Sequence, residues 1–329
     1  MKKDNSRRLF GGLVVIFFTL FLIGNAAAQS KEVKFPTRPL SIIVPYGAGG
    51  APDIHARLVA IYWKKILGQP VVVVNKPGAG GALGYREIAH SQPDGYTLGC
   101  MAFPNSPVLA AEKGKDAGFR NEDFIPVANF TRTPDALAIG KDPPFKTFQE
   151  FLTYAKKNPK KVSVSFAGRR QLLEAILIEQ ELGIELNPVV FKSGGELIIS
   201  LLGGHVQASV VASSLVVSAL QKGVVPLALT GSRRMEKLPG VPSFKELGYN
   251  VSIELTTPLV VPKGTPEPVL KKITATLMEM RKDKDFIEKV NASGAIYDAM
   301  FPPELEKYYE DTCSSISRIV ERNKSRFVE

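Results

Sequence analysis

The sequence predicts an α/β protein with two domains built on parallel sheets. Three observations support this fold class. Short apolar or β-branched runs alternate with helical segments, and such alternation favours strand–helix–strand units with right-handed crossovers. Glycine-bearing turns follow strands and open helices. The chain has 329 residues, 44% of them hydrophobic and 22% charged, which is ordinary globular usage and sufficient length for two domains.

The first predicted elements alternate regularly. The apolar run at 40–46 is typical of a buried strand. A helix is expected over 52–67, because Pro52 stands near its first position and Gly68 follows its last turn. The same reasoning predicts a strand at 71–74, a helix at 82–90 and a strand at 96–102.

A second alternating set and a helical tail follow. The expected strands are 136–139, 162–166, 189–191, 206–211, 225–229 and 255–261. The expected helical segments are 148–157, 171–182, 197–202, 266–281, 284–293 and 303–323. Because no period of 20–50 residues recurs, the pattern excludes a solenoid.

The first 28 residues are predicted to be a cleavable signal peptide. Basic residues dominate positions 1–8, an apolar run follows at 9–23, and Ala26-Ala-Ala28 offers a small-residue cleavage site. The alternative is an uncleaved anchor, but this run is shorter than the roughly 20 residues that cross a bilayer. We therefore expect export from the cytoplasm.

The charge distribution limits the kinds of partner, and the cysteine content limits the possible disulfide bonds. The formal net charge is +10, yet beyond the signal peptide the basic residues form scattered pairs with acids nearby, as on a solvated face. This pattern does not predict a nucleic-acid partner. Cys100 and Cys313 could pair in an oxidising compartment, but spacing alone does not decide it. Cys100 lies in an apolar run, which favours a buried free thiol.

Three glycine-rich turns, at 45–53, 77–84 and 192–196, are candidate anion sites. Such a turn lets the backbone approach a ligand and aims unpaired helix N–H groups at it. The helix dipole then favours a carboxylate or phosphate. For any one turn alone, a tight turn without a ligand is the simpler interpretation. None matches a nucleotide fingerprint, because Pro52 replaces the third glycine of G-x-G-x-x-G and no P-loop motif occurs.

Catalytic patterns are sparse. His55, His90 and His205 are isolated in the sequence, so surface or capping roles are expected rather than metal ligation. No serine lies in G-x-S-x-G. The sequence therefore offers no positive support for an enzyme and predicts neither a cofactor nor a metal.

Several motifs occur along almost the whole mature chain: FPTRPL at 35–40, IVPYGAGGAPDI at 43–54, LGQPVVVVNKPGAGG at 67–81, PDGYTL at 93–98, LLGGHV at 201–206, LALT at 227–230, LPGVPSFKELG at 238–248 and VPKGTP at 261–266. Together and in this order they resemble the Bug (TctC) family. Its members are periplasmic solute-binding proteins of tripartite tricarboxylate transporters.

The resemblance implies a bilobal periplasmic-binding-protein clamshell, with two α/β domains joined by crossing hinge strands. Lobe one would comprise residues 30–125 plus 230–329, and lobe two residues 126–229. The implied function is an extracytoplasmic receptor that captures a small carboxylate and delivers it to the permease subunits of the transporter. Di- and tricarboxylates, aromatic acids and amino acids all remain open as ligands. Receptors of this type need no cofactor and act as monomers.

The resemblance also implies where the ligand binds, largely through backbone N–H groups of two facing loops. The expected residues are Tyr46, Gly47, Ala48, Gly49, Gly50 and Asp53 of the first loop, Gly168, Arg169 and Arg170 before the helix expected at 171–182, and Ser193, Gly194, Gly195 and Glu196 of the facing loop. Asp53 and the 47–50 turn would hold the ligand's carboxylate, and the glycines of the facing loop would close over it.

Two departures from the family pattern leave the ligand open. Small residues common in the family give way to Arg169 and Arg170, which either pair with a second ligand carboxylate or cover the helix from outside. Glu196 puts a negative charge in the facing loop, which would favour an amino or zwitterionic group. Gln207 stands where the family usually has Asp.

Two other functions remain open beside the transport receptor. The chain could be the ligand-binding component of a two-component system, touching the outer domain of a sensor kinase. A neighbouring permease or sensor-kinase gene would distinguish the two. An enzyme is a distant third, because Asp53 and Glu196 have no evident catalytic partner in the sequence.

Overall fold

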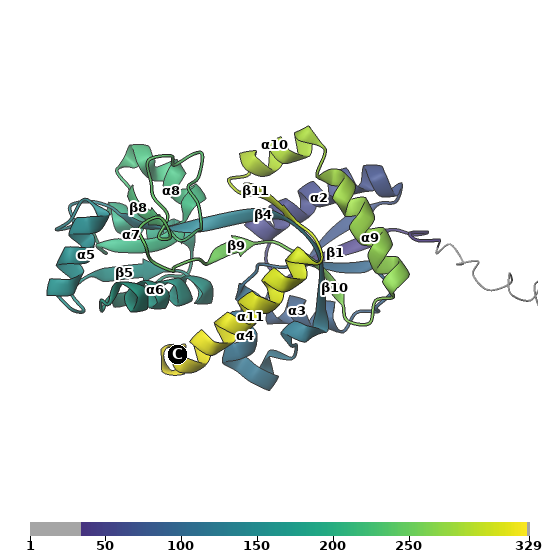
Figure 1. Cartoon of the computed structure of the whole chain (residues 1–329), viewed down its shortest axis with the longest axis horizontal. Coiled ribbons are helices and arrows are strands. Elements are labelled where there is room, and N and C mark those ends of the chain that lie inside the picture. Colours follow the sequence, from purple (N-terminus) through teal and green to yellow (C-terminus); the bar gives the residue numbers. More distant parts are fainter. Residues whose placement is uncertain (1–33, 328–329) are drawn as a thin grey trace, which may run out of the picture. The chain divides into compact units, whose positions relative to one another are not determined.

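The computed structural model describes residues 34–327. The predicted signal peptide, residues 1–28, lies outside the described residues. The residues from Pro36 onward form one compact unit. That unit contains ten α-helices and eleven strands within the described range (Figure 1).

The first three strands form a parallel group in the order β2-β1-β3. They are β1 (Leu40–Val44), β2 (Val71–Asn75) and β3 (Thr97–Cys100). The connecting helices are α2 (Ala51–Leu67) and α3 (Ala82–Ala89). Helix α2 has a proline in its first turn and ends at Gly68, which is left-handed with φ of 68°. The predicted alternation is confirmed here.

The sheet as a whole is mixed, so the parallel pairing predicted from the alternation holds among β1–β3 but not across the whole sheet. Strand β10 (Leu259–Pro262) runs antiparallel between β3 and the 16-residue strand β4 (Phe124–Ile139). The predicted strand 136–139 is only the end of β4. The predicted strand 255–261 is two strands, β9 (Glu254–Thr256) and β10. Hydrophobic runs report burial but not strand direction, which explains the error.

A second parallel group lies at the other end of β4, in the order β7-β5-β6. Its strands are β5 (Ser163–Phe166), β6 (Asn187–Val190) and β7 (Ala208–Ala212), and β8 (Val225–Leu229) pairs with β4. The helices between them are α5 (Phe148–Lys157), α6 (Arg169–Leu182), α7 (Gly194–Leu202) and α8 (Ser213–Ala219). We call β1–β3 the first strand group and β5–β7 the second.

The remaining elements complete the unit. They are α4 (Asn105–Lys113), α9 (Glu267–Met280), α10 (Lys284–Ala292), β11 (Ile296–Met300) and α11 (Glu304–Arg322). Helices α9, α10 and α11 were expected, whereas α4, α8 and β11 are absent from the sequence prediction. Helix α4 was not predicted, because Pro104 and Pro107 interrupt its helical pattern.

One hydrophobic cluster joins helices that are far apart in the sequence. It contains Val108 of α4, Leu173 and Ile176 of α6, and Ile316 and Val320 of α11, all buried. In Figure 1, α11 runs beside α4 toward α6. Because burying such a side chain stabilises by about 1.5–3 kcal/mol, this cluster holds the start of α6 against α4.

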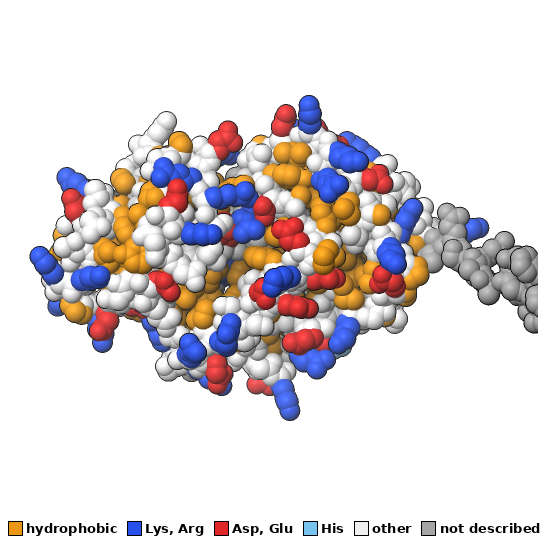
Figure 2. All heavy atoms as spheres, in the orientation of Figure 1, with side chains coloured by type: hydrophobic (Ala, Val, Ile, Leu, Met, Phe, Trp, Pro, Cys, Tyr) orange, Lys and Arg blue, Asp and Glu red, His pale blue; other side chains and the backbone are white. Residues whose placement is uncertain are grey.

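The distribution of surface charges and the state of the two cysteines agree with what the sequence predicts. Figure 2 shows Lys and Arg interspersed with Asp and Glu over the face in view. Cys100 and Cys313 are both buried free thiols, so the bridge left open by the sequence is absent. No described helix is long and apolar enough to cross a membrane.

Candidate functional site

The predicted site residues all lie where parallel strands end. In the first strand group, the loops at 45–50, 76–81 and 101–104 follow the carboxyl ends of β1, β2 and β3. In the second strand group, the turns after β5 and β6 contain Gly168 and Ser193. Open α/β sheets bind ligands outside the carboxyl ends of their strands. These ends, which face each other across residues 128–135 of β4, are therefore the candidate site.

Tyr46 joins the three loops of the first strand group. Its hydroxyl donates to the carbonyl of Gly80 at 3.2 Å and accepts from Nδ2 of Asn105 at 3.3 Å. The Tyr85 hydroxyl lies 3.3 Å away. Burial raises the pKa of Tyr46, so the group is a neutral phenol at physiological pH. Asn105 was missed by the sequence reasoning, because the helix that carries it was missed.

Asp53 organises the first loop from within. The carboxylate is buried and accepts hydrogen bonds from the backbone N–H of Gly49, from Nδ2 of Asn75, both at 2.9 Å, and from Nε of Arg57 at 3.0 Å. Burial alone would raise the pKa of Asp53, but these hydrogen bonds hold it below its ordinary value. Asp53 is therefore negatively charged, and its oxygens accept hydrogen bonds that hold the first loop in place.

The same loop presents backbone donors beside open space. Gly50 is the N-cap of α2 and no side chain caps the helix. The first N–H groups of a helix have no partner within it, and Pro52 supplies none. No atom lies within 4 Å of where a Cβ would stand on Gly47 or Gly49. Gly49 also needs glycine, because its φ is +85°.

Arg169 brings the start of α6 to the first strand group. Its Nε and Nη2 both bond to the carboxylate of Glu112 on α4, with Nη2 at 3.0 Å from Oε1. Its Nη1 lies 3.6 Å from where a Cβ of Gly80 would stand. Arg169 is thus placed against the turn that also holds the Tyr46 hydroxyl.

Arg170 points into the protein. Its guanidinium bonds to Glu174, and Nη2 lies 3.0 Å from Oδ2 of Asp135 on β4. Gln171 donates to the same Asp135 oxygen at 2.9 Å. Burial opposes the charge on Arg170, but the two carboxyl groups outweigh it and raise the pKa. The alternative that both arginines cover the helix from outside is wrong for Arg170, which is 8% exposed.

The facing loop is capped by its own side chains. Ser193 Oγ accepts from the N–H of Glu196 at 3.4 Å, and Oε2 of Glu196 accepts from the N–H of Lys192 at 3.0 Å. A Cβ on Gly194 would come within 2.5 Å of Cδ1 of Leu215, so a larger residue there would displace the end of that side chain. Among the described residues, no hydrogen bond or ion pair joins this loop to residues 46–53.

Two buried hydroxyls were not predicted. Ser165 lies on β5 and Ser213 begins α8 directly after β7, and both are fully buried. Their Oγ atoms have no hydrogen-bond partner in the described structure. An unsatisfied buried hydroxyl costs about 1–3 kcal/mol, so such a group usually serves a purpose. Their position near strand ends is the only signal in the sequence that could have identified them.

His55, in the second turn of α2, is buried rather than at the surface, contrary to expectation. Nδ1 lies 3.2 Å from Oγ1 of Thr257, and Nε2 lies 3.2 Å from Oγ of Ser293. Burial lowers the pKa of His55 to about 4. The neutral ring thus ties the helix that carries the first loop to two distant segments. No group of three or more His, Cys, Asp or Glu in the described range could hold a metal ion.

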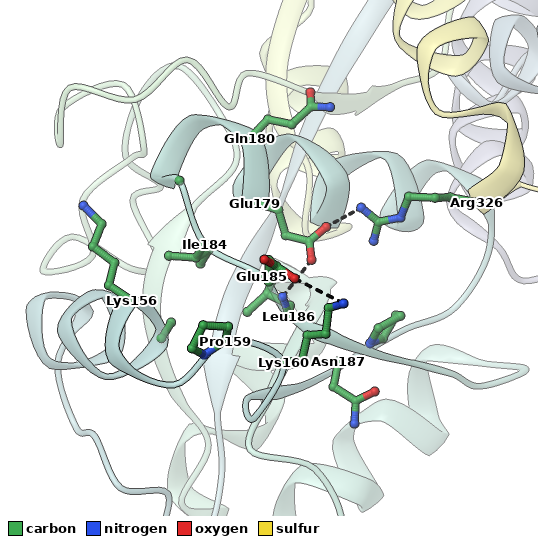
Figure 3. Close-up of a pocket in the computed structure, with 13 residues that line it drawn as sticks. Lys156, Pro159, Lys160, Glu179, Gln180, Ile184, Glu185, Leu186, Asn187 and Arg326 are labelled. Atoms are coloured by element: carbon green, nitrogen blue, oxygen red, sulfur yellow. Dashed lines mark hydrogen bonds and ion pairs between the residues drawn. The ribbon is translucent and has the colours of Figure 1, made fainter.

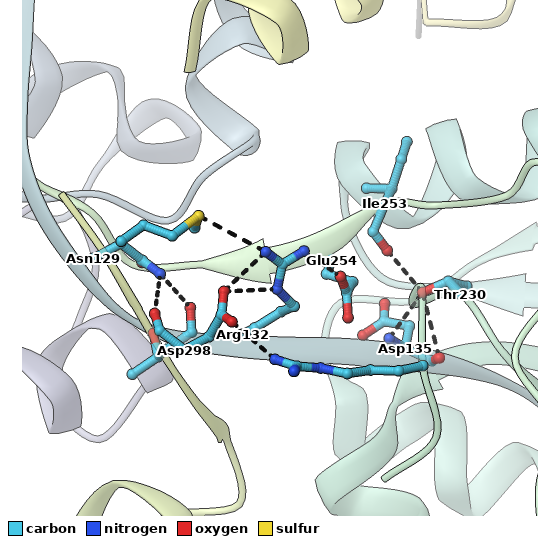
Figure 4. Close-up of polar contacts among 10 residues, drawn as sticks. Asn129, Arg132, Asp135, Thr230, Ile253, Glu254 and Asp298 are labelled. Carbon is cyan, nitrogen blue, oxygen red and sulfur yellow. Dashed lines mark hydrogen bonds and ion pairs between the residues drawn. The ribbon is translucent and has the colours of Figure 1, made fainter. Parts of the chain in front are cut away.

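A network of charges joins the strands that cross near the middle of β4 (Figure 4). Arg132 of β4 donates to Glu254 of β9 at 2.7 Å and to Asp298 of β11 at 3.0 Å. Thr230 donates to the carbonyl of Ile253 at 2.8 Å and accepts from the N–H of Asp135 at 3.0 Å. These contacts join β4 to β9, to β11 and to the segment that follows β8.

A separate pocket of about 700 Å³ lies at the opposite edge of the second strand group (Figure 3). It is near the amino ends of β5 and β6 and is lined by none of the predicted site residues. Four of its charged groups pair with one another, Glu179 with Arg326 and Lys160 with Glu185. Its place at the amino ends argues against it as the ligand site.

Known proteins resemble this chain in sequence and in fold. Residues 55–324 match the model of the TctC family, described as the tripartite tricarboxylate transporter family receptor. A Cupriavidus necator protein, described as the UPF0065 protein in the gbd 5′ region, is 36% identical over 258 residues, covering 76% of this chain and 77% of its own.

Solved structures of similar fold include a TctC solute-binding protein from Polaromonas. It has a TM-score of 0.75 and 28% identity, covering 88% of this chain and 99% of its own. MatC from Rhodopseudomonas palustris, solved with bound malate, has a TM-score of 0.70 and 29% identity, covering 87% of this chain and all of its own length (100%).

Proposed function

The chain belongs to the TctC family of tripartite tricarboxylate transporter receptors, a family of solute-binding proteins, and from this premise we propose that it captures a small carboxylate and delivers it to a transporter permease. The observation that carries the proposal is that the carboxyl ends of the two strand groups face each other across the middle of β4. There the uncapped loop at 46–50 and the start of α6 meet through Tyr46, Gly80 and Arg169.

We propose that the ligand lies between two lobes, residues 30–125 with 230–329 and residues 126–229. The first strand group belongs to one lobe and the second to the other, while β4 passes between them. The pairing of Arg169 with Glu112 is a contact of the kind that two lobes make when they approach over a ligand.

The ligand's carboxylate is proposed to accept from backbone N–H groups of the first loop. Gly47 and Gly49 leave the space beside that backbone open, and the dipole of α2 favours an anion there. Asp53 acts indirectly in this proposal, by holding Gly49 in place. The glycines at 194 and 195 and the buried hydroxyls of Ser165 and Ser213 provide the facing side. Malate, a dicarboxylate, in the similar MatC structure supports the carboxylate class but does not decide how many carboxyl groups this chain's ligand carries.

The proposed location is the periplasm, after removal of residues 1–28, with no cofactor and with a monomeric receptor as the working form. The alternative partner is the outer domain of a sensor kinase, which would read the same ligand-bound state. A deletion of the cognate permease genes separates the two roles, because it abolishes uptake in the first case and leaves ligand-dependent gene expression in the second.

Binding by the first loop is tested with Gly50→Leu. Gly50 has φ of −76°, and its Cβ would lie 3.7 Å from the nearest atom, so leucine fits the fold while covering the N–H groups. We expect at least a tenfold loss of affinity for carboxylates, measured by isothermal titration calorimetry. Gly240→Leu is the matched control, because a Cβ there meets no atom within 4 Å. Unchanged affinity in the Gly50 variant would refute the site.

A further inference from the structure

The arginines beside the candidate site already have carboxyl partners within the protein. Arg170 faces both Asp135 and Glu174, and Arg169 faces Glu112. For these arginines, pairing with a second ligand carboxylate was one of the two alternatives that the sequence left open. The charge that the site accepts at the far end of the ligand therefore depends on whether these arginines are available to it.

The Arg170 cluster is complete without a ligand. Asp135 and Glu174 are 1% and 0% exposed, and Arg170 lies between them. Diverting its guanidinium to a ligand would leave two buried carboxyl groups without their cation. Breaking such a buried pair from one side is strongly unfavourable. Arg170 is therefore a positioning residue that fixes the start of α6 on β4.

Arg169 is held in the same way. Its fork meets both oxygens of Glu112, the bidentate geometry in which Arg–carboxylate pairs are strongest. The Glu112 side chain is only 7% exposed, and its other neighbour is Lys113 at 3.1 Å. A ligand carboxylate would have to compete with a carboxylate already fixed in place.

The lysines of these loops do not replace the arginines. Lys76, after β2, pairs with Glu87 at 3.2 Å. Lys192, before the facing loop, is exposed, and a solvated ammonium contributes little to an ion pair. Around Tyr46 the polar groups are neutral, namely a phenol, the Asn105 amide and the Gly80 carbonyl.

We infer that the site takes a monocarboxylate, a ligand with one carboxylate for the 46–50 loop and an uncharged far end, in preference to a dicarboxylate of the same length. This inference rests on the proposed function. It also accounts for the two arginines, because both are paired with carboxyl groups of the protein itself. Glu112 is assigned as the residue that determines this specificity, because it neutralises Arg169 beside the site.

The test compares ligands that differ only in the second carboxylate. Hexanoate and adipate, butyrate and succinate, and benzoate and terephthalate are titrated calorimetrically into the wild-type protein at pH 7.5. We expect the monocarboxylate of the preferred pair to bind at least tenfold more tightly. Equal or tighter binding of the dicarboxylate would overturn the inference and leave the proposed function standing. Binding of none of the six would contradict the proposed function itself.

Variants assign the preference to Glu112. Glu112→Gln releases Arg169. It should tighten binding of the dicarboxylate at least tenfold relative to the monocarboxylate of the same pair. Adding Arg169→Gln should remove that gain. Glu185→Gln is the control, because it removes one acid from an exposed pair with Lys160. An equal effect of the control would overturn the assignment. If Glu112→Gln fails to fold by circular dichroism, the wild-type ratio still decides the ligand class.

Discussion

Several side chains of this protein have partners that their positions in the sequence do not reveal. Asp53 is correctly predicted in the first turn of α2, yet its partners Asn75 and Gly49 show that it shapes the loop. Arg169 and Arg170 are adjacent in sequence but have different partners, on α4 and on β4. The sequence could indicate charge at these positions, but the partners depend on how distant segments pack.

His55 makes a pH-dependent contribution to stability. Its pKa is lowered by burial to about 4, below the ordinary 6.5 that the unfolded chain retains. As the pH falls, the unfolded chain therefore takes up the proton first. The contribution is complete above about pH 6.5 and is lost progressively down to about pH 4. The difference between the two pKa values corresponds to about 3 kcal/mol.

His55→Gln should flatten that part of the stability profile. We expect the free energy of unfolding, measured with urea at steps between pH 4 and 7, to fall less steeply in this variant than in the wild type. His90→Gln, at an exposed histidine, should keep the wild-type slope. Identical slopes in all three proteins would show that His55 does not titrate in this way.

At the scale of elements, the sequence predicts strands and helices well and their directions poorly. The strand–helix alternation and the glycine ends of α2 and α6 are confirmed. The length of β4 was missed, because Pro126 and Pro134 interrupt a strand that nonetheless continues through them. Its antiparallel pairing with β10, β7 and β9 involves residues far apart in sequence, which local patterns do not report.

Arg132 connects β4 to β9 and β11 through its ion pairs with Glu254 and Asp298. Glu254 is 3% exposed and depends on Arg132 for its charge partner. Arg132→Met should therefore destabilise the protein by about 3–5 kcal/mol, measured by chemical denaturation. Arg234→Met removes the same charge from an exposed pair with Glu246 and should cost less than about 1 kcal/mol. Equal losses would mean that the network contributes no more than a surface ion pair.

At the scale of the whole molecule, the site depends on segments that meet only in the folded chain. The motif order identified the family from the sequence, and the carboxyl ends of the strands located the candidate loops. The contact of Arg169 with Glu112, 57 residues away, depends on the packing of α6 against α4 and α11. This is why the sequence predicted an anion site but left the charge at the ligand's far end open.

The central claim is that the loop at 46–50 holds the ligand's carboxylate. The most direct measurement is a crystal structure of the protein with its tightest-binding carboxylate. We predict carboxylate oxygens within hydrogen-bond distance of backbone N–H groups between Gly47 and Ala51, with Arg169 still bonded to Glu112. A carboxylate bound instead in the pocket at the amino ends of β5 and β6, or held by Arg169 with that loop empty, would contradict the account.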